Sequence, residues 1–384
     1  MEQDLVEPPA AARTLPIRFT ASGSEYFRIW IVNLLLMICT LGLYTPFAKA
    51  RQLRYFHENT LIDGAPLAFH GDPWRMLRGY LLVGGAALVY AALSHFWPLA
   101  GAVLLLLMAP AWPWLMRSAL RFRLGQTSWR GLRMRFEGSV ADAYRVFWPI
   151  AVPLAITIVT QALIAPTAEA DEAADAVEAA APSLAMLGLM GIATFSTVCM
   201  APWIHWRLKV YQHNHYALAD EHTRLEGVRG WDFYKVQLGL LGVSLLCSLV
   251  IGALVALTMF VVPAALVVVG PVLYLLLLAV AYAYMTGRFQ DLVWGHTRSA
   301  HVQFHSRLSV SSLTWLTLKN SLLTAITLGL YWPFAAVATT RMRLSAVSIE
   351  VSRPVEQLIG EARDAAADAT GEAAGDLLGF DVAL

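Results

Sequence analysis

The chain has 384 residues, of which 58% are hydrophobic and only 14% are charged, and its formal net charge is +1. An ordinary soluble domain carries about 25% charged residues, so this chain has too little polar surface to cover itself in water. The composition disfavours a soluble protein with buried core helices and predicts a membrane protein.

The first element along the chain is a short polar tail. Residues 1–15 lack the basic start and the apolar run of a signal peptide, so we expect them to be disordered. The apolar segment Ile29–Ala48 follows and is long enough for one membrane crossing but not two. It either crosses once or forms a re-entrant helix–turn–helix that bends at Thr40–Gly42, and Gly42 suits such a bend.

Three long intervals then lack any Lys or Arg: from Arg78 to Arg117, from Arg145 to Arg207 and from Lys235 to Arg288. Each interval can hold two spanning helices and a short connection. We therefore predict six full spans: Leu77–Phe96, Leu99–Met116, Phe147–Ala165, Ser183–Trp203, Val236–Val262 and Ala264–Tyr284.

The charge pattern orients these spans. The segments between the pairs are rich in Arg, which is typical of cytoplasmic loops, whereas the Ala/Glu-rich stretch 166–182 carries acids and no base. We place the Arg-rich segments and the C-terminus in the cytoplasm and stretch 166–182 outside. Alternation in "LRMRF" and the Asp63–Gly64 pair predict small cytoplasmic β-hairpins between the spans.

Nine residues recur almost unchanged at the two ends of the chain. The stretch Thr40–Ala48 reads TLGLYTPFA and Thr327–Ala335 reads TLGLYWPFA; over Asn33–Arg54 and Asn320–Arg341 twelve of 22 positions are identical. Weaker copies follow Pro113, Pro202 and Met285. The repeat favours the re-entrant alternative for both terminal copies.

The predicted fold class is therefore an all-α multi-pass membrane protein of repeated two-helix units, with about six spans, two terminal re-entrant or short helical hairpins and small cytoplasmic β-hairpins. A single membrane domain, residues 16–353, would contain five units. These are residues 19–68, 69–135, 136–224, 225–303 and 304–353. Residues 354–384 form an acidic, Ala-rich tail whose final "LLGFDVAL" is apolar enough to dock on the cytoplasmic face.

The sequence resembles the YjgN-like family of bacterial inner-membrane proteins. The resemblance is carried by "EYFRIWIVNLLLMICTLGLYTPFAKARQLRYFHENTLIDG", by "FHGDPWRMLRGYLL" and "SWRGLRMRFEG", and by the C-terminal "TLGLYWPFA". It extends over nearly the whole chain. The family is uncharacterised in function, so the resemblance implies an inner-membrane location and a topology but neither a reaction nor catalytic residues.

Two groups of residues are candidate sites. Asn33 and Asn320, with Tyr44 and Tyr331, occupy equivalent positions beside the two bends and either line a pore or bond neighbouring helices. Arginines at the ends of the spans either bind anionic lipid headgroups or only follow the positive-inside rule. They are Arg51, Arg54, Arg121, Arg207 and Arg341.

Other patterns give weaker indications. His213 and His215, near Asp220, Glu221 and His222, lack a closed metal-ligand spacing, so no metal is predicted. Cys39, Cys199 and Cys247 lie in apolar segments and are expected to be core residues. The sequence shows no phosphate-loop, zinc-protease or hydrolase motif, so we expect no enzyme, catalytic residue, cofactor or nucleic-acid partner. A transporter or channel for an unknown solute and a non-catalytic membrane scaffold remain as alternatives.

Overall fold

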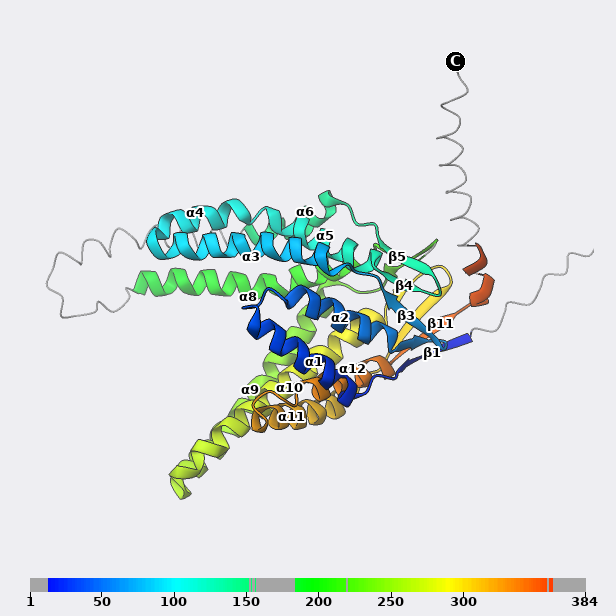
Figure 1. Cartoon of the computed structure of the whole chain (residues 1–384). Helices are drawn as coiled ribbons and strands as arrows, with labels where there is room; N and C mark the ends of the chain where they lie inside the picture. The colour runs from blue at the N-terminus through cyan, green and yellow to red at the C-terminus, as the bar shows by residue number, and fades with distance from the viewer. Residues whose placement is uncertain are drawn as a thin grey trace, which may run out of the picture.

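Long helices extend from one side of a small antiparallel sheet (Figure 1). The computed structural model describes residues 13–151, 153, 156, 184–218, 220–357 and 359–361. The predicted acidic insert 166–182 and the apolar end "LLGFDVAL" lie outside these residues, as does most of the predicted span Phe147–Ala165.

The sheet corrects the all-α prediction. Among the described residues, eleven strands form one antiparallel sheet in the order β7-β6-β5-β4-β3-β2-β1-β11-β10-β9-β8. Isolated short hairpins are marginally stable and leave unpaired edges, so the hairpins pair with one another instead. The strands are β1 Arg13–Phe19, β2 Thr60–Ile62, β3 Ala65–Phe69, β4 Thr127–Trp129, β5 Leu132–Phe136, β6 Tyr216–Leu218, β7 Glu221–His222, β8 Arg224–Leu225, β9 Thr297–Arg298, β10 Val302–Ser306 and β11 Val347–Val351.

The sheet curls into a nearly closed barrel. Its two outermost strands, β7 and β8, are consecutive parts of one extended segment that is interrupted only at Thr223. Strand β1 lies between β2 and β11, with Phe19 opposite Thr60 and Arg13 opposite Val351. Residues 13–15 therefore belong to a strand, which corrects the predicted N-terminal tail at its last residues.

Two-residue turns join the central hairpins. Asp63 and Gly64 both have positive φ values, of 49° and 75°, as do Arg130 and Gly131, of 48° and 87°. Consecutive positive φ values are the requirement of a type I′ turn, whose twist matches the strands that it connects. The Asp-Gly turn predicted from the sequence is present between β2 and β3.

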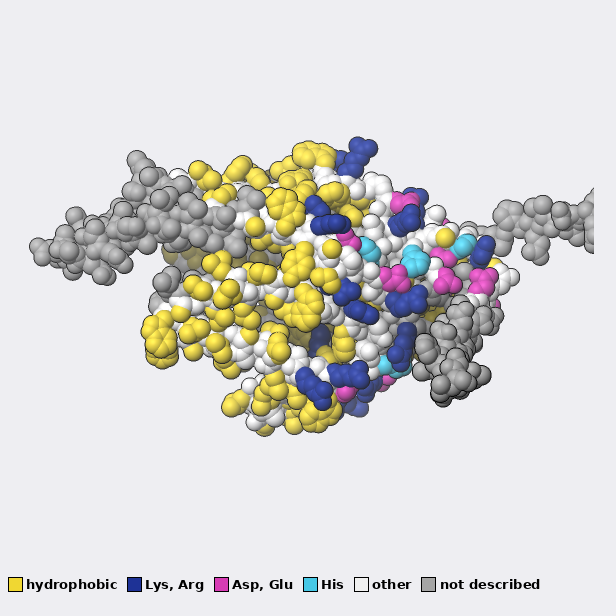
Figure 2. Space-filling model, turned by 90° about the horizontal axis from the view of Figure 1, so that it is seen from above, with side chains coloured by type: hydrophobic (Ala, Val, Ile, Leu, Met, Phe, Trp, Pro, Cys, Tyr) yellow, Lys and Arg dark blue, Asp and Glu magenta, His cyan; other side chains and the backbone are white. Residues whose placement is uncertain are grey.

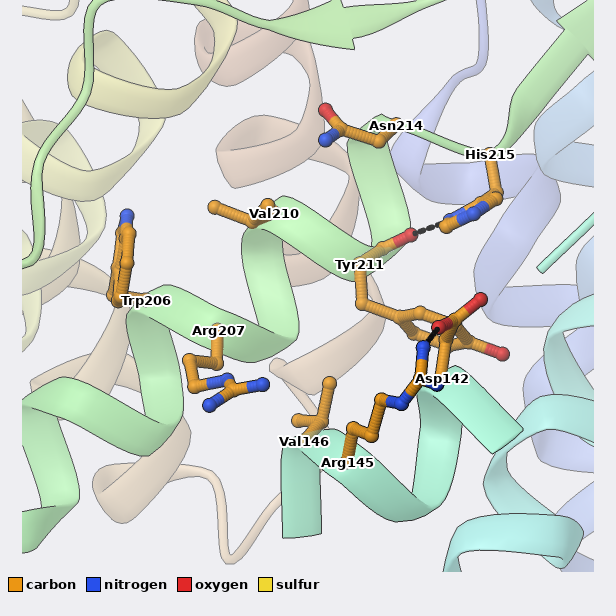
Figure 3. A pocket seen from close by; sticks show the side chains of 9 residues that line it. All are labelled: Asp142, Arg145, Val146, Trp206, Arg207, Val210, Tyr211, Asn214 and His215. Carbon is orange, nitrogen blue, oxygen red and sulfur yellow. Dashed lines mark hydrogen bonds and ion pairs between the residues drawn. The ribbon is translucent and has the colours of Figure 1, made fainter. Parts of the chain in front are cut away.

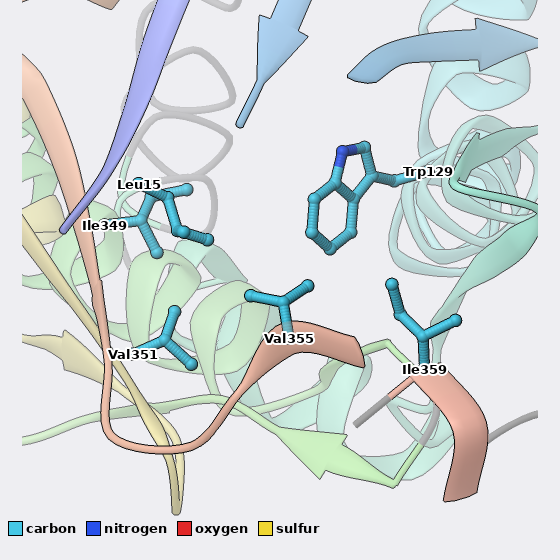
Figure 4. Close-up of a cluster of buried hydrophobic side chains, with 6 residues drawn as sticks. All are labelled: Leu15, Trp129, Ile349, Val351, Val355 and Ile359. Atoms are coloured by element: carbon cyan, nitrogen blue, oxygen red, sulfur yellow. The ribbon is translucent and has the colours of Figure 1, made fainter. Parts of the chain in front are cut away.

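The barrel encloses one hydrophobic cluster (Figure 4). Its buried members are Leu15, Trp129, Ile349, Val351, Val355 and Ile359. Partly buried side chains from β2, β3, β5, β6 and β10 pack against them, so the cluster is lined from strands all around the barrel. Val355 and Ile359 come from the segment after β11, whose residues 355–357 and 359–361 are helical. The start of the predicted tail 354–384 is therefore part of the barrel core.

The helices form a ring that follows the strand order and that is open between α4 and α5. Along the described chain, α1 packs on α2, α2 on α3 and α3 on α4; α5 then packs on α6, α6 on α8, and so on through α12, which packs on α1, whereas no principal contact joins α3 or α4 to α5. The helices are α1 Gly23–Cys39, α2 Thr45–Glu58, α3 Pro73–Phe96, α4 Pro98–Met108, α5 Ala111–Gly125, α6 Val140–Phe147, α8 Leu184–His213, α9 Gly230–Val261, α10 Leu266–Trp294, α11 Val310–Ile326 and α12 Trp332–Ser345, with short 3₁₀ helices η1 Trp148–Ile150 and η2 Pro263–Ala265.

The prediction of six full spans is wrong for the described residues, where three helical segments are long and apolar enough to cross a membrane. They are Pro73–Phe96, Gly230–Val261 and Pro263–Trp294. The predicted span Leu99–Met116 is divided between α4, of 11 residues, and α5, of 15 residues, and α5 soon becomes basic. The predicted span Ser183–Trp203 falls in α8 from Leu184 on, and α8 is not among the three segments.

The two terminal copies fold as matching helix–turn–helix units. In the first bend, Thr40 Oγ1 donates to Leu36 O at 2.7 Å and accepts from Tyr44 N at 3.0 Å. In the second, Thr327 Oγ1 makes the equivalent bonds, at 2.7 and 3.0 Å, with Leu323 and Tyr331. The following residues, Leu41 and Leu328, are each 94% exposed at the tips.

Helices α1 and α12 bring these two units together. Phe27 lies 5.7 Å from Phe334 between ring centroids, and Trp30 lies 6.2 Å from Trp332. Arg341 Nη2 donates to Ala21 O at 2.6 Å, which ties α12 to the segment before α1. The matched ends of the sequence therefore lie side by side in the ring.

Candidate functional site

Lys and Arg side chains gather along the boundary between the apolar helices and the charged barrel (Figure 2). We call this set the basic belt. We define it as the Lys and Arg residues of the helices that lead into strands β2, β4, β6, β9 and β11, which are Lys49, Arg51, Arg54, Arg117, Arg121, Arg123, Arg207, Lys209, Arg288, Arg341 and Arg343. The five arginines predicted to contact lipid all belong to it, on α2, α5, α8 and α12. Arg51, Arg54, Arg121 and Arg341 are exposed.

One groove opens within this belt, between α6 and α8 (Figure 3). Its volume is about 320 Å³, and its lining combines cations, aromatic rings and apolar side chains. The lining residues are Asp142, Arg145, Val146, Trp206, Arg207, Val210, Tyr211, Asn214 and His215. A volume of this order is large enough for a small ligand.

Helix α6 is positioned by its N-terminal cap. Ser139 Oγ accepts from Asp142 N at 3.0 Å, and the Ser139 hydroxyl donates to the Asp142 carboxylate at 2.6 Å. Tyr211 on α8 donates to Ser139 O at 3.0 Å, which fixes the distance between the two helices. Buried Ala143 and Val146 face α8, and they pack in one cluster with Tyr211 and Phe136.

The polar groups of the groove are unequally paired. Arg145 Nη1 donates to Asp142 Oδ1 at 2.9 Å. The hydrogen bond from Ser139, and then Arg145, hold the pKa of the Asp142 carboxyl below its usual range. Arg207 instead stacks over Trp203, with its guanidinium carbon 5.0 Å from the ring centroid. Within the described residues no hydrogen bond or ion pair engages the Arg207 guanidinium, so the groove carries an uncompensated positive charge.

Two lysines of the belt lie close to other cations. Burial, and then the charge of Arg123, lower the pKa of Lys49 although its side chain is solvent-exposed. Burial, and then Arg343, lower the pKa of Lys209 in the same way. Their hydrogen bonds go to glutamines, Gln52 and Gln212, each at 3.2 Å.

The four predicted pore residues each have their own local surroundings. Asn33 on α1 is 4% exposed and accepts from Arg51 Nη1 at 3.3 Å. Tyr44 stacks on Phe47 and Tyr331 on Phe334, each at 5.5 Å. Helix α12 packs against both α1 and α11, which carry the two asparagines. None of the four residues lines the groove between α6 and α8.

Asn320 differs from its counterpart in having no partner. It is 5% exposed, and in the described residues neither its side-chain oxygen nor its nitrogen makes a hydrogen bond; Thr317 Oγ1 is unpaired in the same way. The repeat explains the difference, because Ala338 stands where the first copy has Arg51.

The histidines flagged in the sequence serve packing. His213 is buried, its Nδ1 lies 2.9 Å from Thr297 Oγ1, and its ring packs on Trp294 and Tyr216. His215 Nδ1 instead bonds Tyr211 O at 2.7 Å. The three cysteines are free; Cys39 and Cys199 are exposed on the helices and Cys247 is half-buried, so they are not the buried core residues predicted.

Sequence reasoning identified Arg207 but missed the groove that surrounds it. Asp142, Arg145 and Trp206 become a site only because α6 lies against α8, a contact between segments some 60 residues apart. The one local signal was the Ser139-x-x-Asp142 pattern, which marks the start of a helix.

The comparisons with known proteins, like the long apolar helices, indicate a membrane protein. Residues 14–377 match a family described as bacterial protein of unknown function, DUF898. The chain belongs to this family. It is 29% identical over 141 residues to the inner membrane protein YjgN of Salmonella typhimurium strain LT2, which is 36% of either chain. It is also 29% identical over 150 residues to YjgN of Escherichia coli strain K12, or 38% of this chain and 37% of the relative.

The aligned stretch therefore spans little more than a third of the relatives' length. No solved structure matches the chain. Together with its long apolar helices, the family membership assigns the chain to bacterial inner-membrane proteins whose function is unknown.

Proposed function

We propose that the chain is a non-catalytic, multi-pass membrane scaffold, built from repeated units, that holds a filled β-barrel on the cytoplasmic side. The orientation is supported by the basic belt, which lies on the barrel side of the apolar helices (Figure 2). The C-terminal segment enters the barrel, so it would be cytoplasmic as well.

One observation favours a scaffold over a solute channel. The barrel lies at the end of the helical ring, and Trp129, Val355 and Ile359 fill its interior together with strand residues. Packed interiors of this kind leave no room for a solute. The predicted pore residues are also engaged in packing, with Asn33 bonded to Arg51.

A transporter or channel is the second candidate. It is favoured by the arrangement of the helices. The principal helix–helix contacts of the described chain join neighbours in the ring rather than helices on opposite sides of it. In this alternative, the C-terminal segment would have to leave the barrel before a solute could pass.

Flux measurements separate the two candidates. The full chain is reconstituted in vesicles loaded with a panel of ions and small solutes, beside protein-free vesicles. The scaffold proposal predicts no protein-dependent flux. Saturable flux of any solute through the wild-type protein would overturn it in favour of transport.

Cysteine labelling in the same vesicles tests the topology. With the native cysteines replaced, we expect Ser24→Cys, near the belt, to react only from the barrel side. Phe260→Cys, which lies 89% exposed near the end of α9, should react only from the opposite side. Labelling of both positions from one side would contradict the multi-pass arrangement.

A further inference from the structure

The groove between α6 and α8 combines features that a lipid headgroup requires and that the scaffold proposal does not use. Its axis runs from the membrane side, where Val146 and Arg207 lie, toward the barrel side, where Asn214 and His215 lie, since α6 and α8 run in opposite directions (Figure 3). A ligand in the groove would therefore contact Arg207 at the end nearer the apolar helices.

The groove offers hydrogen-bond donors that nothing in the described chain occupies. Arg207 has a planar fork of five N–H donors and is held in place by Trp203. Arg145 uses one nitrogen for Asp142 and keeps others. Asn214 accepts from Leu225 N through Oδ1 at 2.8 Å, which leaves its amide nitrogen as a further donor.

The charge balance selects an anion. Two arginines and one aspartate line the groove, and the aspartate is already paired with Arg145. Arg207 is left as the uncompensated cation. A guanidinium fork matches the oxygens of a phosphate, and such charge-assisted hydrogen bonds are stronger than neutral ones.

The surroundings favour a lipid over a free anion. Trp148, directly after α6, is 63% exposed, Tyr144 is 40% exposed, and Trp231 at the start of α9 is 58% exposed. Exposed Trp and Tyr side chains of this kind gather at the headgroup level of a bilayer. Val210, which is only partly buried, adds an apolar surface on which the first carbons of acyl chains can pack.

We propose that this groove binds the headgroup phosphate of an anionic membrane phospholipid, with Arg207 as its principal donor and Arg145 as a second. The proposal does not depend on whether the protein is a scaffold or a transporter.

Arg288 provides a matched control. Its guanidinium carbon lies 5.7 Å above the ring of Tyr284, one helical turn earlier, as Arg207 lies above Trp203. Both arginines belong to the basic belt, but Arg288 does not line the groove. Arg207→Gln and Arg288→Gln thus remove the same charge from the same kind of local setting.

The experiment counts lipids that stay bound to the purified full chain by native mass spectrometry, after titration with phosphatidylglycerol or phosphatidylcholine. We expect Arg207→Gln to weaken phosphatidylglycerol binding about tenfold, the effect of losing charged hydrogen bonds, and Arg288→Gln to leave it nearly unchanged. Arg145→Gln should weaken binding to a smaller extent, and because the Arg145 side chain is 72% exposed, the substitution should leave the fold intact. Phosphatidylcholine binding should respond less to all three changes.

Three results would overturn the proposal. Equal losses in Arg207→Gln and Arg288→Gln would show only general attraction to the belt. Unchanged binding in both Arg207→Gln and Arg145→Gln would exclude the groove. Displacement of phosphatidylglycerol by millimolar inorganic phosphate would assign the groove to a soluble anion. Should Arg207→Gln unfold, as judged by its circular dichroism spectrum, Arg145→Gln alone decides between these results.

Discussion

Arg51 donates a hydrogen bond through Nη1 to Asn33 Oδ1 at 3.3 Å and so joins α2 to α1. The second copy of this unit has the asparagine but not the arginine. Asn320 is consequently buried with both ends of its amide unpaired. The two positions have the same sequence context and opposite energetic consequences.

Replacement of each asparagine by leucine should therefore change stability in opposite directions. An unpaired buried polar group costs about 1–3 kcal/mol, so we expect Asn320→Leu to raise the free energy of unfolding by about 1 kcal/mol or more. Asn33→Leu removes the hydrogen-bond acceptor of Arg51 and should lower the free energy of unfolding by about 1 kcal/mol. Thermal unfolding in detergent measures both, and a destabilised Asn320→Leu would show that the amide has a partner.

The segment after β11 should contribute substantially to barrel stability. Ile359 is 8% exposed in the barrel cluster, whereas Gln357, two residues earlier, is exposed. Truncation of a buried Ile to Ala costs about 2–5 kcal/mol, and an exposed position typically changes stability by less than about 0.5 kcal/mol. We expect Ile359→Ala to be destabilised by at least about 2 kcal/mol relative to Gln357→Ala. Equal unfolding midpoints would mean that the segment does not support the barrel.

Two glycines should respond oppositely to the same substitution. Gly64 has φ +75° in the β2–β3 turn, so Gly64→Ala forces a side chain into the left-handed region and should cost about 1 kcal/mol. Gly125 is the last residue of α5, and a Cβ there would meet no atom within 4 Å. Gly125→Ala should be neutral or stabilising by up to about 1 kcal/mol. The unfolding free energies of the two variants provide the measurement, and equal destabilisation of both would contradict this prediction.

His213 should make the protein less stable in acid. Burial, and secondarily the charge of Lys209, lower its pKa from 6.5 to about 3. Below pH 6.5 the unfolded chain therefore binds a proton that the folded chain does not bind until about pH 3. The free energy of unfolding therefore decreases as the pH is lowered through this window, by about 2 kcal/mol from pH 7 to pH 5.

The variant His213→Gln isolates this effect. Between pH 7 and pH 5, we expect the unfolding free energy of this variant to decrease by about 2 kcal/mol less than that of the wild type. Unfolding midpoints of the two proteins at several pH values provide the measurement. Parallel pH profiles would show that His213 is protonated equally in both states.

Local signals in the sequence predicted some elements and missed others for identifiable reasons. The bends at Thr40 and Thr327 and the turn at Asp63–Gly64 depend on neighbouring residues, and the structure has them at these positions. The barrel depends on pairings such as Arg13 with Val351, between the two ends of the described chain. Strands of two to seven residues carry too weak a pattern to reveal such pairing.

The candidate site shows the same division. Arg207 could be recognised because positive charge after a long apolar stretch is a local feature. The groove could not, because it requires Asp142 and Arg145 to approach α8 from another segment. Asn320 looked equivalent to Asn33, and only the contact between Arg51 and Asn33 shows why they differ.

The place of β1 in the sheet has a consequence for biosynthesis. Within the described residues β1 is the first strand and β11 the last, and β1 pairs on one side with β2 and on the other side with β11. During translation, one edge of β1 remains unpaired until the residues of β11 have been made. A nascent chain that stalls before residue 347 would therefore display an open strand edge that the finished molecule conceals.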